Sequence, residues 1–126
     1  MNVHEIKFKL EKEIIDNTHL ESIFEKIKTY FNLQFDENLK PYLVNNEKIH
    51  DFKDVSNSNQ EEINNNENSF FNFTFSEIVN VPLCKFLFLK NNDKLTILAN
   101  IHELYVDYIS LNSLYDLFNN LENFFF

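Results

Sequence analysis

The residues of this sequence best suited to chemistry are His102, Glu103 and Asp107, which stand together in the stretch Asn100–Ser110. Imidazole has an ordinary pKa of ~6.5 and exchanges a proton near neutral pH, whereas a glutamate at ~4.3 stays ionised unless it is desolvated. Acid–base catalysis is therefore the chemistry that these residue types would serve. A five-residue interval from histidine to aspartate carries little information alone, so its meaning depends on the elements that position it.

The segments on either side of these residues predict a strand before them and a helix after them. Leu83–Leu89 is a nearly continuous apolar run suited to a central strand, and Lys90–Asp93 supplies turn residues. Leu95–Ile101 would return antiparallel as a hairpin and deliver His102 at its end. Ser110 can then cap a closing helix, whose apolar stripe consists of Leu111, Leu114, Phe118 and Leu121.

Upstream, the pattern predicts one strand and one long helix. Ile6, Phe8 and Leu10 alternate with lysines, which is the period of a strand with one face on the core. Thr18–Glu21 resembles a capping box and precedes apolar residues at helical spacing, so we expect a helix over about residues 19–31. A short β-prone segment follows at Pro41–Val44.

Residues 45–69 are rich in Asn, Glu, Asp and Ser and contain hardly any apolar residues. Such a segment buries too little surface to offset the entropy of ordering, so we predict a mobile, solvated loop at about 45–69, with an insertion or a partner-binding loop as alternatives. Phe71, Phe73 and Phe75 alternate with polar residues beyond it, which indicates an extended segment. We expect one domain over residues 1–126, because the strands on either side of the loop need each other for burial.

Composition limits the possible partners and the cellular setting. The 126 residues are 44% hydrophobic and include 15 Phe, enough for one real core. The net charge of −9 and the lack of arginine argue against nucleic acid and favour a basic partner or a neutral small molecule. No signal peptide or apolar run long enough for a membrane is present, and the lone Cys84 suits strand packing, so we expect a cytoplasmic protein that does not bind membranes.

The order of these features resembles the N-terminal lobe of a nonribosomal peptide synthetase condensation domain, in the superfamily of chloramphenicol acetyltransferase. His102 and Asp107 match the His-His-x-x-x-Asp-Gly signature of that family, but Glu103 stands where the second, proton-transferring histidine would be and Tyr108 replaces the glycine. The best-matched block is Val81–Leu121. The resemblance implies an α+β fold: a two-layer chloramphenicol-acetyltransferase-like half domain with a mostly antiparallel sheet packed against two or three helices.

The departures from the signature imply a degenerate active site. An ionised Glu103 would oppose the charge that develops on a tetrahedral oxyanion. In the family the aspartate is structural and pairs with an arginine after the first helix; here Leu33–Phe35 stands at that place and no arginine exists. Tyr108 adds a ring where glycine allows close approach, and we expect His102 to support the loop by hydrogen bonding. His102, Glu103 and Asp107 are the catalytic positions of the motif, and we expect neither a cofactor nor a metal.

The family places its active site between two lobes, and this chain has the length of one, so the resemblance implies a scaffold or interaction module. Its partners would be a phosphopantetheinyl carrier protein or a C-terminal condensation lobe. Carriers are usually acidic, so docking would require Lys7, Lys9 and Lys12 to form a basic patch. One alternative is half of an acyltransferase completed by another chain or by homo-oligomerisation, and another is an unrelated small α+β binding domain.

Overall fold

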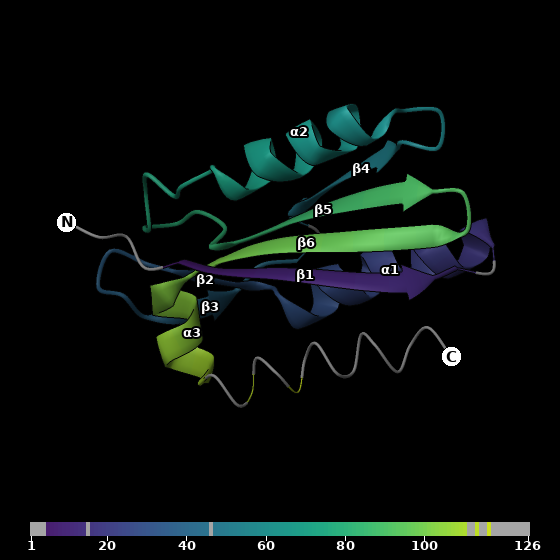
Figure 1. The fold of residues 1–126 in the computed structure, drawn as a ribbon. Coiled ribbons are helices and arrows are strands. Elements are labelled where there is room, and N and C mark those ends of the chain that lie inside the picture. Colours follow the sequence, from purple (N-terminus) through teal and green to yellow (C-terminus); the bar gives the residue numbers. More distant parts are fainter. Residues whose placement is uncertain (1–4, 15, 46, 111–112, 114–115, 117–126) are drawn as a thin grey trace.

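A four-stranded sheet with the order β1-β6-β5-β4 forms the centre of the molecule (Figure 1). The computed structural model describes residues 5–14, 16–45, 47–110, 113 and 116. Its elements in chain order are β1 (Glu5–Glu13), α1 (Asn17–Tyr30), β2 (Leu33–Phe35), β3 (Pro41–Leu43), β4 (His50–Asp54), α2 (Gln60–Phe71), β5 (Cys84–Asn91), β6 (Lys94–His102) and α3 (Glu103–Ile109). The predicted α+β class, a mostly antiparallel sheet packed against helices, is confirmed.

The predicted hairpin forms the middle of the sheet. β5 pairs antiparallel with β6 from Cys84 opposite Ile101 to Asn91 opposite Lys94. Asn92 makes the turn with a φ of 56°, a left-handed conformation that asparagine tolerates better than most residues. β1 pairs antiparallel with the other side of β6, and β4 pairs parallel with β5. The hairpin carries His102 to the edge of the sheet, as the sequence predicts.

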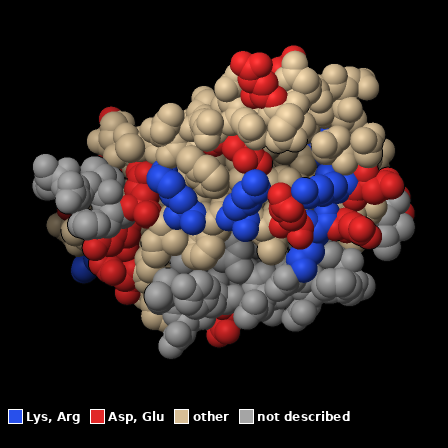
Figure 2. Space-filling view, in the orientation of Figure 1, with Lys and Arg blue, Asp and Glu red and all other residues tan. Residues whose placement is uncertain are grey.

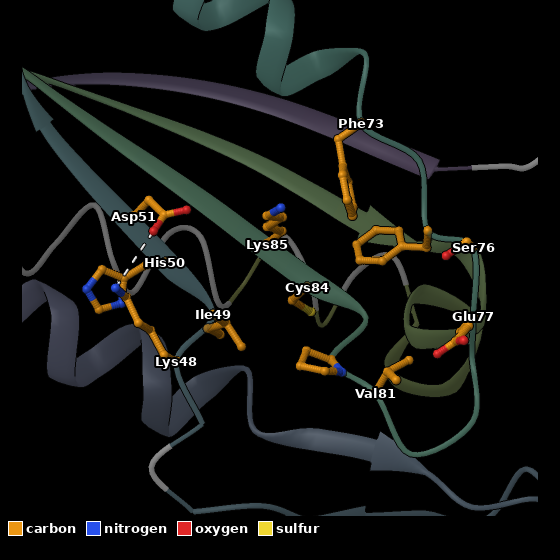
Figure 3. Close-up of a pocket in the computed structure, with 12 residues that line it drawn as sticks. Lys48, Ile49, His50, Asp51, Phe73, Ser76, Glu77, Val81, Cys84 and Lys85 are labelled. Carbon is orange, nitrogen blue, oxygen red and sulfur yellow. Dashed lines mark ion pairs between the residues drawn. The ribbon is translucent and has the colours of Figure 1, made fainter.

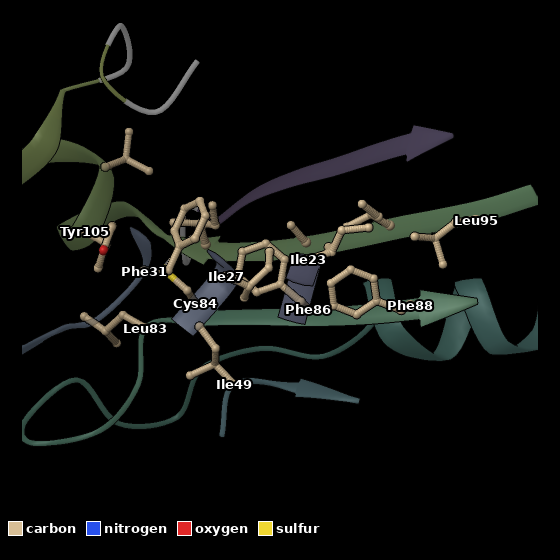
Figure 4. Packing of buried hydrophobic residues seen from close by; sticks show 14 of the residues in the cluster. Ile23, Ile27, Phe31, Ile49, Leu83, Cys84, Phe86, Phe88, Leu95 and Tyr105 are labelled. Carbon is tan, nitrogen blue, oxygen red and sulfur yellow. The ribbon is translucent and has the colours of Figure 1, made fainter. Parts of the chain in front are cut away.

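Side chains of the hairpin are buried on both faces of the sheet. Phe86 and Phe88 face α1, whose Ile23 and Ile27 are fully buried (Figure 4). The alternate residues pack with part of α2 on the opposite face, in a cluster of Val55, Leu87, Leu89 and Leu98 with Ile63, Phe70 and Phe71. Each fully buried side chain of this size stabilises the fold by ~1.5–3 kcal/mol relative to exposure. The two helices therefore cover the hairpin from both sides.

The first helix begins earlier than its sequence pattern indicates. Asp16 is the N-cap, and its side chain accepts a hydrogen bond of 3.0 Å from the backbone N–H of His19. The predicted cap at Thr18 is therefore wrong by two residues. Aspartate is as good an N-cap as threonine, so Asp16 can satisfy the backbone N–H groups of the first turn. The predicted apolar stripe is correct, since Leu20, Ile23 and Ile27 are buried.

The prediction of a mobile loop at about 45–69 is wrong. Residues 50–54 form β4 and residues 60–71 form α2. Asn59 caps α2 by accepting a hydrogen bond of 2.8 Å from Glu62, and two glutamates in the first turn suit the positive end of the helix dipole. A few apolar contacts with the sheet are enough to dock this polar helix. The extended segment predicted from Phe71 is also wrong, since α2 includes Phe71 and no strand follows before β5.

Beyond β6, the motif itself is helical. α3 starts at Glu103, directly after His102, and ends before Ser110. The stripe predicted for the closing helix, residues 111, 114, 118 and 121, lies outside the described residues. Within them, the Ser110 hydroxyl accepts a hydrogen bond of 3.3 Å from the backbone N–H of Ser113, as a cap does. None of the described helices is long and apolar enough to cross a membrane.

His50 makes the folded state sensitive to pH. Its ring stacks on Phe24 of α1 at 4.6 Å, lies edge-on to Phe88, and has a buried Nδ1 without a hydrogen-bond partner. Burial, reinforced by Lys28 and Lys48, lowers the pKa of His50. The unfolded chain therefore binds more protons, and the stability contributed by neutral His50 is lost as pH falls below about 6.5.

We expect urea unfolding to show a steeper loss of stability between about pH 7 and pH 5 in wild type than in His50→Phe. Parallel pH profiles for the two proteins would contradict this.

Candidate functional site

His102 serves the local structure of the motif. It is the N-cap of α3, and its Nδ1 accepts a hydrogen bond of 3.0 Å from the backbone N–H of Leu104. Its own backbone N–H donates to the carbonyl of Leu83 at 2.9 Å, and its half-buried ring lies edge-on to Phe75 at 5.9 Å. In a neutral imidazole that accepts at Nδ1, the proton resides on Nε2. The Nδ1 lone pair of His102 is therefore engaged within the chain.

The two carboxylates of the motif face solvent on the outer side of α3. Tyr105 and Val106 anchor the helix in the core, with 1% and 7% of their surface exposed. Glu103 and Asp107 are one turn apart on the opposite side, both exposed, and neither forms an ion pair with any described residue. The structure thus separates the predicted site residues: His102 points into the fold, while the carboxylates point out of it.

Glu103, at the second position of the motif, is exposed rather than desolvated. Tyr108, at the family's glycine position, is 55% exposed and meets Phe35 edge-on at 5.7 Å. Gln34, at the position of the family's arginine, is buried and accepts from the Tyr42 hydroxyl at 3.2 Å. Among the described residues, Asp107 has no cationic partner of the kind that the signature would give it.

A pocket of about 320 Å³ lies beside the motif, between the first residues of β4 and β5 and the segment after α2 (Figure 3). Phe75 lines it and also contacts His102, but none of the three motif residues lines it. Lys85 extends over the Phe73 ring at 3.9 Å, which is a cation–π contact. The Cys84 thiol at its base is 3% exposed, and burial raises its pKa, so the predicted packing role of this cysteine is confirmed.

Sequence reasoning missed the residues of this pocket. Phe73 and Phe75 were visible as an alternating pair, but the alternation indicated a strand rather than the wall of a cavity. His50 and Lys85 carried no such signal, because the pocket is lined by β4, β5 and the segment before β5, which are separate in the sequence. No group of three or more His, Cys, Asp or Glu side chains in the described part of the chain is placed to hold a metal ion.

The lysines of β1 form no free basic patch, because most of them are paired within the chain. Lys7 lies 3.3 Å from Glu5, and Lys9 lies 3.2 Å from Glu67 of α2. Figure 2 shows lysines interleaved with acidic side chains across this face. Lys94 of β6 binds Glu11 at 3.0 Å and holds the pKa of that carboxyl below its usual value. Two of the three lysines of the expected basic patch, Lys7 and Lys9, are therefore paired with carboxylates of the chain.

Comparison with known proteins identifies the fold. No protein-family model matches the sequence, and no curated protein matches it significantly. The starter condensation domain of the rhizomide synthetase RzmA matches with a TM-score of 0.61 and 12% identity, over 85% of this chain and 29% of that one. VibH, a condensation enzyme, matches with a TM-score of 0.60 and 15% identity, over 82% and 26%. The four-domain synthetase AB3403 matches with a TM-score of 0.67 and 11% identity, over 96% and 10%.

The chain has the chloramphenicol-acetyltransferase-like fold of half a condensation domain. It spans less than a third of each of these solved chains. The fold therefore confirms the resemblance to the N-terminal lobe of a condensation domain that the motif and its flanking elements indicated.

The capping role of His102 predicts its response to substitution. His102→Ala leaves the Leu104 N–H without its acceptor and is expected to lower the free energy of unfolding by about 1 kcal/mol. His102→Asn supplies another cap and should retain most of that stability. Urea unfolding monitored by circular dichroism measures both. Asp107→Asn is the matched control, since an exposed, unpaired carboxylate should change stability by less than about 0.5 kcal/mol. An Asp107→Asn protein that is less stable than the His102 variants would contradict the capping role of His102.

Proposed function

We propose that this chain is a condensation-domain-like N-terminal lobe that is catalytically degenerate and acts as an interaction or scaffold module in a peptide-synthetase or related acyltransferase system. The observation that carries the proposal is the use of His102 as a helix cap while an exposed Glu103 stands at the proton-transfer position. The fold supports the setting, because the similar solved chains are condensation domains and synthetases.

The chemistry of the motif argues against ordinary condensation. A general base needs a free lone pair near the attacking amine or hydroxyl, and that of His102 at Nδ1 is engaged with Leu104. To take a proton at this atom, His102 would have to release the start of α3. The negative charge of Glu103 would disfavour a developing oxyanion nearby. Loss of general acid–base assistance costs about 10² to 10⁴ in rate, so the chain alone would be a very weak catalyst.

Among the partners considered, a C-terminal condensation lobe fits better than a carrier protein. The chain carries a net charge of −9, and Lys7 and Lys9 are already neutralised by carboxylates of the chain. An acidic carrier would therefore meet repulsion. The alternative of an unrelated α+β domain required a fold without a hairpin that leads to His102, and β5 and β6 form that hairpin. The alternative of a composite acyltransferase predicts a different outcome in the following experiment.

Acyl transfer from an acyl pantetheine thioester to an amine tests the proposal directly. Wild type, His102→Ala and Glu103→Gln are expected to give equal rates, all close to that of the uncatalysed reaction, because Nδ1 of His102 is already engaged with Leu104. Free thiol released per unit time is the measurement, and light scattering gives the oligomeric state in the same buffer. Turnover that is lost in His102→Ala or Glu103→Gln would refute the proposal, and turnover confined to an oligomer would establish the composite acyltransferase.

A further inference from the structure

Apolar side chains are concentrated at one end of the molecule, beside α3. Six large hydrophobic residues are exposed in the described chain, and five of them lie on β2–β3, the segment before β5 and α3. The sixth, Phe52, is on β4. We call this surface the acidic apolar face, and its apolar members are Leu39, Tyr42, Leu43, Val79 and Tyr108. Such clustering differs from the scattered exposed hydrophobics of an ordinary surface and marks an interaction site.

Direct contacts join the three segments of the face. The Tyr108 ring of α3 lies against Phe35 of β2 at 5.7 Å. Asn80, next to Val79, donates its backbone N–H to the carbonyl of Phe35 at 2.7 Å, and its side-chain oxygen lies 2.8 Å from the Tyr42 hydroxyl. These contacts place the three segments side by side, with the buried Phe35 between them.

The turn between β2 and β3 holds Leu39 in an exposed position. Leu39 has a φ of 60°, a left-handed conformation that is costly for a bulky residue, and 47% of its surface is exposed. The Asp36 side chain fixes this turn by accepting hydrogen bonds from the backbone N–H groups of Asn38, at 2.8 Å, and Lys40, at 3.0 Å. Preorganisation of an apolar side chain at a loop tip reduces the entropy lost on binding.

Carboxylates surround these apolar residues. The segments 36–43, 76–82 and 103–110 contain five Asp or Glu residues and one lysine, which gives the face a formal charge of −4. Glu37, Glu77, Glu103 and Asp107 are exposed and form no ion pair with another described residue. Acidic side chains gather at the end of the molecule that bears α3 (Figure 2). This differs from β1, where Lys7 and Lys9 have acidic partners.

We propose that the acidic apolar face binds a partner protein whose contact surface is apolar at its centre and rimmed by lysine or arginine. This inference rests on the proposed function, since it names the chemistry of the partner that an interaction module requires. Charge complementarity selects the partner: two copies of the face would bring −4 against −4, and like charges in register cost several kcal/mol. A second copy of this chain is therefore excluded from the face by the same charges that attract a basic partner.

The experiment uses a fluorescent amphipathic helical peptide of leucine and lysine as the probe, and a leucine–glutamate peptide of the same pattern as its counterpart. Fluorescence anisotropy should show that wild type binds the lysine peptide and not the glutamate peptide. Leu39→Asn/Leu43→Ser is expected to weaken binding about tenfold or more, because both side chains are apolar centres of the face. Asparagine tolerates the left-handed conformation at position 39, so this variant should remain folded.

Matched variants separate this face from the general acidity of the chain. Glu37→Gln/Glu77→Gln should weaken binding and reduce its dependence on salt, whereas Glu61→Gln/Glu62→Gln on α2 removes the same charge elsewhere and should leave the affinity within about twofold. Phe52→Ser is the apolar control on β4. The proposal would be overturned if Glu61→Gln/Glu62→Gln and Glu37→Gln/Glu77→Gln lowered the peptide affinity equally. Unchanged peptide affinity in Leu39→Asn/Leu43→Ser would also overturn it.

Two further outcomes are informative. A wild-type dimer in light scattering that becomes monomeric in Leu39→Asn/Leu43→Ser would assign the face to a second copy and overturn the proposal. Failure of the peptide to bind would overturn it too, while leaving the proposed degenerate lobe intact. The acyl-transfer test has an independent readout, because thiol release depends on His102 and Glu103 and peptide binding does not require turnover.

Discussion

The burial of both faces of the β5–β6 hairpin is the constraint on which the rest of the structure depends. A hairpin that is apolar on one face needs packing against that face alone. In this hairpin Phe86 and Leu87 point to opposite sides of the sheet, and both are almost fully buried. One helix cannot cover both faces, so α1 and α2 must lie on opposite sides of the sheet. β1 and β4 then complete the hydrogen bonding of the hairpin's two edges. The position of His102, at the end of β6, follows from this arrangement.

The strand-to-helix junction at His102 shows how packing of a helix determines the contacts of the residue that precedes it. Tyr105 and Val106 pack α3 against the core, and this fixes the direction in which the helix starts. The imidazole at the start then satisfies a backbone donor of Leu104. The same packing turns the carboxylates of Glu103 and Asp107 to solvent.

The hairpin, β1 and the stripe of α1 were predictable because their signals are local: continuous apolar runs, alternation, and helical spacing. α2 was not, since only Ile63, Phe70 and Phe71 bury surface and the residues between them are polar. Its stability comes from tertiary contacts with Val55 and the sheet, which no local pattern encodes. For the site, the motif positions were visible in the sequence, but the hydrogen bond at His102 depends on the backbone direction at the end of β6. Pairing of Lys9 with Glu67 was equally hidden, because it joins residues 58 positions apart.

The shallow attachment of α2 has a consequence for how the protein opens. No residue of α2 is fully buried, although Leu87, Leu89 and Leu98 beneath it are. Detachment of this one helix would break few contacts while it exposes three adjacent aliphatic side chains of the central strands. Subglobal opening of this kind requires less free energy than global unfolding and appears in native-state hydrogen exchange as a separate cooperative unit. Because β1 and β4 still pair the edges of the hairpin, what opens to other chains is an apolar face, and α2 shields that face from such contacts.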